Sequence, residues 1–347
     1  FFAKALTGQQ AQRPRWKRGV SLVNGSLGEA VGKMYVDKYF PPESKARMQK
    51  LVNNLLAAYK DSITNLDWMT ADTKKEALAK LAKFTTKIGY PDKFRSYEGL
   101  AIKADDLVGN AERANKFESD FQLAKLGKPV DRSLWLMTPQ EINAYYNPVQ
   151  NEIVFPAAIL QPPFFDPKAD DAVNYGAIGS VIGHEIGHGF DDQGRHFDGD
   201  GKLRDWWTKA DDTEFSKRAK MLVAQFSALE ALPGLHVKGE LTLGENIGDL
   251  GGLQIAYKAY KASLNGQKSP VIDGYTGEQR FFIGSAQEWR EKFRDEYLRS
   301  IVTSNEHAPG MFRGYMPMTN TDAFYEAFDV KPSDKLFRKP EERVRIW

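Results

Sequence analysis

The chain has 347 residues, of which 41% are hydrophobic and 27% are charged, as in an ordinary globular protein with room for two domains. Its 48 basic and 46 acidic residues leave a formal net charge of +2, which gives no reason to expect nucleic acid or an anionic membrane surface as a partner. The absence of cysteine excludes disulfides, thiolate zinc sites and a cysteine nucleophile.

No apolar stretch of about 18 residues predicts a membrane helix, and no signal peptide is visible. The numbering begins at Phe1 rather than at a methionine, so we expect a processed or truncated chain. Residues 1–25 are mixed and basic, which is typical of a solvated surface, and a helical pattern begins at Ser26. Apolar spacings of three and four then predict further helices over residues 43–63, 70–88 and 105–128.

The middle of the chain predicts a small β element. Residues 142–146 and 152–155 are short β-type runs, and Asn147-Pro148 between them is a turn signal. Helical patterns return in the remainder, apart from a polar loop at 191–202 and an irregular tail at 305–339. They cover residues 172–190, 211–230, 241–263, 277–299 and 320–328. The expected fold class is mainly α with a small β element.

The clearest chemical signal is the sequence His184-Glu185-Ile186-Gly187-His188 inside the predicted helix 172–190. An α-helix has about 3.6 residues per turn, so His184 and His188 lie one turn apart on one face. Two imidazoles at that spacing can bind one Zn²⁺, and Glu185 beside them can act on a metal-bound water. Three glycines flank the histidines, although each costs a helix about 1 kcal/mol relative to alanine. They indicate close approach by another segment.

A catalytic zinc needs a third protein ligand and one open position. The metzincin pattern is excluded, because Gly194 stands where it requires histidine, and His196 and His236 lie at no recognised spacing. Glu245 and Asp249 are better candidates, since they lie four residues apart on a predicted helix whose neighbours are apolar. One of them can ligate the metal while the other accepts a hydrogen bond from a ligating imidazole. Asp191, three residues past His188, is placed for the same supporting role.

Five motifs in order give the chain a resemblance to a known family. The chain resembles the C-terminal half of a neprilysin-like (endothelin-converting-enzyme-type) zinc peptidase, and the resemblance covers essentially its whole length. The motifs are Asn143-Ala144-Tyr145-Tyr146, residues 153–165, residues 184–192, residues 244–249 and His307-Ala308-Pro309.

The resemblance implies a thermolysin-like (gluzincin) catalytic domain with one Zn²⁺ per site. It implies His184, His188 and Glu245 as zinc ligands, with Glu185 as general base. Asp191 and Asp249 would orient the ligating histidines. Asp249 is also expected to be one of the catalytic residues.

The resemblance also implies how a peptide substrate would be held. Asn143 and Ala144 would bind its backbone along an edge strand. His307 would stabilise the oxyanion, and Arg313 would bind a substrate carbonyl on the leaving-group side. The residues that match the family's apolar pocket for the residue after the scissile bond are Ile159, Phe164, Val181 and Trp289. Without the family resemblance, the sequence would give no reason to assign a special role to His307, Arg313 or Trp289.

Two departures from the family matter. Animal members usually have a cysteine three residues before a C-terminal Trp, and here that position is Val344, which suggests a bacterial, disulfide-free member. Complete members are about twice as long, and their N-terminal half builds most of a helical cap over the site. Residues 1–95 are therefore expected to be the end of that cap and residues 96–347 the catalytic domain, with the missing half as a covalent or separate partner. An extracytoplasmic location, periplasmic or secreted, is favoured over a cytoplasmic one.

The expected function is zinc-dependent endopeptidase cleavage of oligopeptides before hydrophobic residues, by a zinc-bound water that Glu185 activates. Two alternatives stay open. The first is a catalytically silent peptide-binding protein with a structural zinc, which would need four protein ligands and no base beside the metal. The second is an exopeptidase of the same zinc class, although no Gly-x-Met-Glu-Asn motif for a substrate amine is present.

Overall fold

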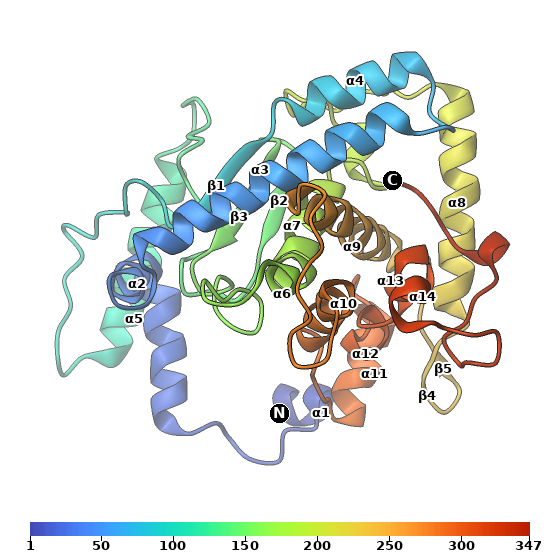
Figure 1. The fold of residues 1–347 in the computed structure, drawn as a ribbon. Helices are drawn as coiled ribbons and strands as arrows, with labels where there is room; N and C mark the ends of the chain where they lie inside the picture. Colours follow the sequence, from blue (N-terminus) through green and yellow to red (C-terminus); the bar gives the residue numbers. More distant parts are fainter.

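The computed structural model describes residues 1–347 and is built mainly from helices, with a small sheet beside the long helix Pro42–Asn65 (Figure 1). The expected mainly α class with a small β element is confirmed. The helices are α1 (Phe2–Thr7), α2 (Arg15–Tyr39), α3 (Pro42–Asn65), α4 (Ala71–Leu81), α5 (Leu107–Leu123), α6 (Asp171–Asn174), α7 (Ser180–Gly187), α8 (Lys209–Ser227), α9 (Leu243–Ser263), α10 (Gly277–Gln287), α11 (Asp295–Ser304), α12 (Gly310–Arg313), α13 (Met316–Thr319) and α14 (Asp322–Phe328). The strands are β1 (Thr85–Gly89), β2 (Tyr145–Asn147), β3 (Glu152–Pro156), β4 (Glu230–Leu232) and β5 (Leu235–His236). None of the helices combines the length and the apolar run needed to cross a bilayer.

Helix α3 ties the N-terminal part of the chain to the centre of the fold. It contacts β1, α7 and α9, and in Figure 1 it runs diagonally across them. The predicted helix 43–63 is confirmed, because its apolar stripe is buried along the whole element. Within that stripe, the fully buried Tyr59 donates a hydrogen bond of 2.7 Å from its hydroxyl to the carbonyl of Gly183 in α7. The helix predicted from Ser26 begins earlier, at Arg15.

The prediction of one helix over residues 70–88 is wrong in its second half. Helix α4 ends at Leu81, and Thr85–Gly89 forms strand β1, which pairs in parallel with β3. Two β-branched threonines and Ile88 suit a strand, and Ile88 lies opposite the buried Phe155. Pairing with a distant strand therefore outweighs the local helical spacing.

The sheet has the strand order β1-β3-β2, so β2 is an edge strand. The predicted hairpin is confirmed, since β2 and β3 are antiparallel and Tyr146 lies opposite Ile153. Its first strand is shorter than predicted and begins at Tyr145, so Asn143 and Ala144 lead into the edge strand. That edge faces the cavity described below.

The predicted helix 172–190 is one helical stretch made of α6, a π-helical turn at Tyr175–Gly179 and α7. It ends at Gly187, and His188 is its C-terminal cap. The close approach that the glycines indicated is confirmed. A Cβ atom on Gly183 would lie 2.7 Å from Cα of Gly252 in α9, so the two helices touch through glycine.

The C-terminal third corrects two expectations. The helix predicted over residues 277–299 is two helices, α10 and α11, because the chain leaves the helix after Gln287 and turns Glu288 and Trp289 into the cavity wall. The tail expected to be irregular contains α12 and α13 in addition to the predicted short helix, which is α14. Helix α12 brings Arg313 to the site.

Lys80, on α4, holds the loop that follows α7. Its side chain is 1% exposed, and its Nζ donates to the carbonyls of Gly189 (2.5 Å), Gly194 (2.8 Å) and Phe197 (2.7 Å). Burial lowers the pKa of Lys80 to about 7, although the negative charge of Asp191 opposes this. One buried ammonium group therefore ties together three carbonyl groups of the loop, and it is the only donor to the carbonyl of Gly189.

We expect Lys80→Met to lower the free energy of unfolding by about 3 kcal/mol or more, because it removes three hydrogen bonds of a buried ammonium group and leaves the Gly189 carbonyl without a donor. Urea denaturation measures the change. Lys83→Met is the matched control, since Lys83 is exposed and pairs only with Asp200 at 2.7 Å; its effect should stay within about 0.5 kcal/mol. Equal losses in the two variants would contradict the assigned role of Lys80.

Candidate metal centre

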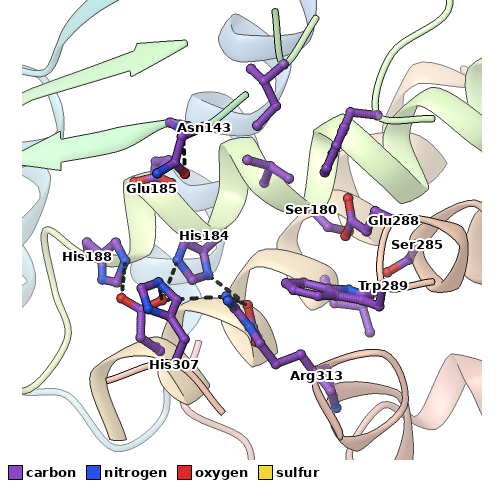
Figure 2. A pocket seen from close by; sticks show the side chains of 18 of the residues that line it. Asn143, Ser180, His184, Glu185, His188, Ser285, Glu288, Trp289, His307 and Arg313 are labelled. Carbon is purple, nitrogen blue, oxygen red and sulfur yellow. Dashed lines mark hydrogen bonds and ion pairs between the residues drawn. The ribbon is translucent and has the colours of Figure 1, made fainter. Parts of the chain in front are cut away.

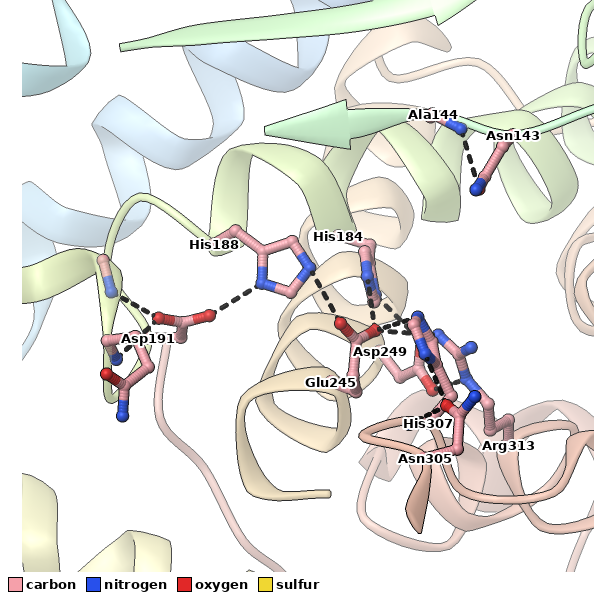
Figure 3. Close-up of polar contacts among 12 residues, drawn as sticks. Asn143, Ala144, His184, His188, Asp191, Glu245, Asp249, Asn305, His307 and Arg313 are labelled. Atoms are coloured by element: carbon pink, nitrogen blue, oxygen red, sulfur yellow. Dashed lines mark hydrogen bonds and ion pairs between the residues drawn. The ribbon is translucent and has the colours of Figure 1, made fainter. Parts of the chain in front are cut away.

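Three side chains from two touching helices face one another at the centre of the fold. His184 and His188 come from the end of α7 and Glu245 from the first turn of α9 (Figure 3). Their ligand atoms all lie within 4.8 Å of one another. His184 Nε2 is 3.2 Å from Glu245 Oε2, and His188 Nε2 is 3.6 Å from Glu245 Oε1. The structure thus brings together the three residues predicted as zinc ligands.

A carboxylate holds the far side of each imidazole. Nδ1 of His184 lies 2.9 Å from Asp249 Oδ1, and Nδ1 of His188 lies 2.7 Å from Asp191 Oδ2. Such a pair keeps the proton on Nδ1 and leaves the Nε2 lone pair free for a metal. The sequence left open which carboxylate of α9 faces the metal, and the geometry favours Glu245.

The Glu245 carboxylate fits an ion between the imidazoles. Its Oε2 is inaccessible to solvent and forms no well-aligned hydrogen bond, although His307 Nε2 lies 3.0 Å away. Although burial raises the pKa of Glu245, contacts with His184 and His307 hold it well below its usual range. Two imidazole nitrogens and one carboxylate oxygen are a ligand set that zinc prefers.

Asp249 is itself held by a cation. Arg313 donates from Nε to Asp249 Oδ2 and from a terminal nitrogen to Oδ1, both at 2.7 Å. Burial alone would raise the pKa of Asp249, but the paired Arg313 lowers it to about 2. The guanidinium also lies 4.3 Å from the centre of the Trp289 ring. In this structure Arg313 therefore contacts the carboxylate behind His184.

Two further predicted residues lie beside the three ligands. Glu185 is buried on α7, on the side of the cavity where Asn143 lies (Figure 2), and burial raises its pKa, which favours proton uptake. His307 is 44% exposed, and Asn305 Oδ1 lies 3.0 Å from its Nδ1. The sequence did not single out Asn305. Its position two residues before a candidate histidine is the only local signal.

A cavity of about 460 Å³ opens beside these residues. Asn143 and Ala144 line it from the sheet edge, and the Ala144 amide donates to Asn143 Oδ1 at 3.0 Å. The four residues of the predicted apolar pocket also line it: Ile159, Phe164, Val181 and Trp289. The sequence missed four polar residues of the wall: Ser180, Ser285, Glu288 and Glu306. By contrast, His196 and His236 are exposed and lie outside this group.

Comparisons with known proteins agree with the family resemblance seen in the sequence. A family model described as peptidase family M13 matches residues 143–344, and a second model with the same description matches residues 1–91. Human neprilysin is 38% identical over 360 residues, which cover all of this chain and 48% of neprilysin. The neutral endopeptidase of Lactobacillus helveticus is 38% identical over 348 residues, which cover all of this chain and 52% of that protein.

Solved structures agree with the sequence comparisons. The zinc metalloprotease Zmp1 of Mycobacterium tuberculosis, in complex with an inhibitor, matches with a TM-score of 0.96 at 57% identity, over all of this chain and 53% of that one. PepO of Lactobacillus rhamnosus matches with a TM-score of 0.89 at 34% identity. The chain spans about half the length of the curated relatives it matches.

We expect Asp191→Asn to weaken zinc binding about 10- to 100-fold, because the amide no longer fixes the His188 ring with a charged acceptor. Competition against a chelator of known affinity measures the change. Asp192→Asn is the matched control, since Asp192 is the neighbouring acid but does not contact His188. If both variants bind zinc as tightly as the parent, Asp191 does not support the ligand.

Proposed function

Because the chain belongs to peptidase family M13, we propose that it is the catalytic half of a zinc-dependent endopeptidase that hydrolyses oligopeptides. The observation that carries this is the buried group His184, His188 and Glu245, with the carboxylate of Glu185 next to it on the same helix. A structural zinc site would need a fourth protein ligand and no such base. The arrangement favours hydrolysis over passive binding.

His184, His188 and Glu245 would hold the ion. When bound, the ion supplies Lewis-acid polarisation of the scissile carbonyl and lowers the pKa of water towards about 7. Glu185 takes the proton of the attacking water and passes it to the leaving amine, a role suited to a buried carboxylate of raised pKa. His307 donates to the oxyanion of the tetrahedral intermediate, a contribution of about 10²–10³ in rate for comparable donors.

The substrate backbone would lie along the edge strand β2. Asn143 and Ala144 precede that strand at the rim of the cavity, and an edge strand can pair with an extended peptide. Arg313 would bind the substrate carbonyl on the leaving-group side while keeping its contact with Asp249. The apolar wall of Ile159, Phe164, Val181 and Trp289 would favour cleavage on the amino side of hydrophobic residues.

The missing half of the protein is the partner that we propose for the remaining surface. Helices α2 and α5 pack together at one side of the fold (Figure 1), and both leave large apolar side chains exposed. They include Val20, Val23, Met34, Leu107, Val108 and Leu123. We propose that a helical cap covers these side chains, with residues 1–95 as the end of that cap and residues 96–347 as the catalytic domain. An extracytoplasmic location remains part of the proposal.

The first test is Glu185→Gln. Zinc binding and peptide binding should persist, because Glu185 is not one of the three ligands, while turnover should fall by about 10²–10⁴ or more. Zinc content, peptide affinity and kcat are measured on the same preparation, with chelator-treated parent as the control. Normal turnover in this variant would contradict the role of Glu185 as the general base. Product mapping on an end-blocked peptide separates endopeptidase from exopeptidase action.

The second test compares this chain with the full-length protein. A cap would restrict access by size and would therefore slow the cleavage of a long unfolded protein more than that of a short peptide. We expect the kcat/KM for the long substrate, divided by that for the short peptide, to be higher for this chain alone than for the full-length protein. The ratio of the two kcat/KM values measures this and cancels differences in active fraction. An unchanged ratio would argue against an access-restricting cap.

A further inference from the structure

The pocket for the residue after the scissile bond contains an acid that its apolar character does not explain. Glu288 follows directly after α10 and lines the cavity next to Trp289. Figure 2 shows its carboxylate between Ser180 and Ser285, above the indole ring of Trp289. The pocket therefore has apolar walls and one carboxyl group among them.

We propose that Glu288 determines specificity by selecting, after the scissile bond, a side chain whose apolar stem ends in a hydrogen-bond donor, such as tyrosine or lysine. This inference rests on the proposed peptidase function and deepens it. Two steps carry it: one carboxyl oxygen of Glu288 lacks a donor, and two neighbouring donors, Ser180 and Arg313, are already engaged.

The first step concerns the oxygen itself. Oε2 of Glu288 is inaccessible to solvent and forms no hydrogen bond within the chain. A buried acceptor without a partner costs about 1–3 kcal/mol, so a ligand that supplies a donor would gain what the chain lacks. Burial, together with the negative charge of Asp249, raises the pKa of Glu288 well above its ordinary value, although the charges of Arg313 and His184 oppose this.

The second step concerns the neighbours. The Ser180 hydroxyl donates to the Gly176 carbonyl at 2.7 Å and is therefore engaged within its own helix. Arg313 directs two nitrogens to Asp249. The Ser180 hydroxyl and the Arg313 guanidinium are therefore committed elsewhere, and a molecule in the cavity can supply the donor that Oε2 of Glu288 lacks.

The consequence is a preference between side chains of equal shape. Phenylalanine and norleucine would leave Oε2 unpaired, whereas tyrosine and lysine carry a donor at the end of a similar apolar stem. Discrimination by hydrogen bonding of this kind is stronger than discrimination by one methylene group. A lysine would also bring the positive charge that offsets ionisation of Glu288.

The experiment uses four peptides that differ only after the scissile bond, with phenylalanine, tyrosine, norleucine or lysine. The zinc-loaded chain and the full-length protein are each assayed for kcat/KM. In Glu288→Leu, the Tyr/Phe and Lys/norleucine ratios should both fall about tenfold, because the acceptor is replaced by an apolar group. In Glu288→Gln, the Tyr/Phe ratio should persist while the Lys/norleucine ratio falls, because the acceptor remains and the charge is lost.

Glu306→Gln is the matched control, since Glu306 is an exposed acid on the same cavity and its removal should leave the Tyr/Phe ratio unchanged. A fall in only one ratio supports the inference and shows whether the favoured donor is neutral or cationic. If neither ratio changes beyond about twofold in Glu288→Leu, the inference is overturned while the peptidase function stands. If the parent cleaves none of the four peptides, the proposed function fails. In that case the same peptides are tested for binding to zinc-loaded Glu185→Gln with and without Glu288→Leu. The Tyr/Phe and Lys/norleucine ratios of Kd then decide the role of Glu288 by the same criteria.

Discussion

The contact between α7 and α9 determines the distance between the imidazoles and the carboxylate that face them. The two helices approach closely because glycine meets glycine, and a Cβ on Gly252 would lie 2.5 Å from the carbonyl oxygen of Ser180. A Cβ on Gly248 would lie 2.7 Å from Nδ1 of His184, so this glycine leaves room for the ring. Any side chain at these positions would push α9 away, and Glu245 would no longer reach both histidines. The helical stability lost to glycine is the cost of that proximity.

A second constraint follows from burying so many charges in one place. Asp249 faces both His184 and Arg313, so one carboxylate orients a ligand while a cation from α12 balances its charge. This couples the C-terminal helices to the centre of the site. Glu288 lies close enough for the charge of Asp249 to raise its pKa, and its Oε2 forms no hydrogen bond within the chain. The same crowding that brings the three candidate ligands together therefore leaves one carboxyl oxygen of the cavity wall without a donor.

Short-range patterns in the sequence predict the parts of the structure that depend on neighbours along the chain. The spacing of His184 and His188, the apolar stripe of α3 and the hairpin of β2 and β3 all belong to this class. Strand β1 does not, because its parallel partner β3 lies far along the chain and its register cannot be read locally. The positions of His307 and Arg313 came only from family resemblance, since nothing in their own segments marks them. Glu288 matched no motif, and only the three-dimensional cavity makes its burial visible.

Several contacts that hold the site in place come from residues before the proposed domain boundary at residue 95. Tyr59 bonds to the carbonyl of Gly183, and Lys80 holds the carbonyls of the loop that carries Asp191. Strand β1 extends the sheet whose opposite edge faces the cavity. All three precede residue 95, yet Tyr59 and Ile88 of β1 belong to the same hydrophobic core as α7 and α9, and Lys80 is buried. The proposed boundary at residue 95 divides the sequence, but the physical unit that holds the three candidate ligands includes α3, α4 and β1. A break in the chain within or after α3 would therefore remove contacts that support the site.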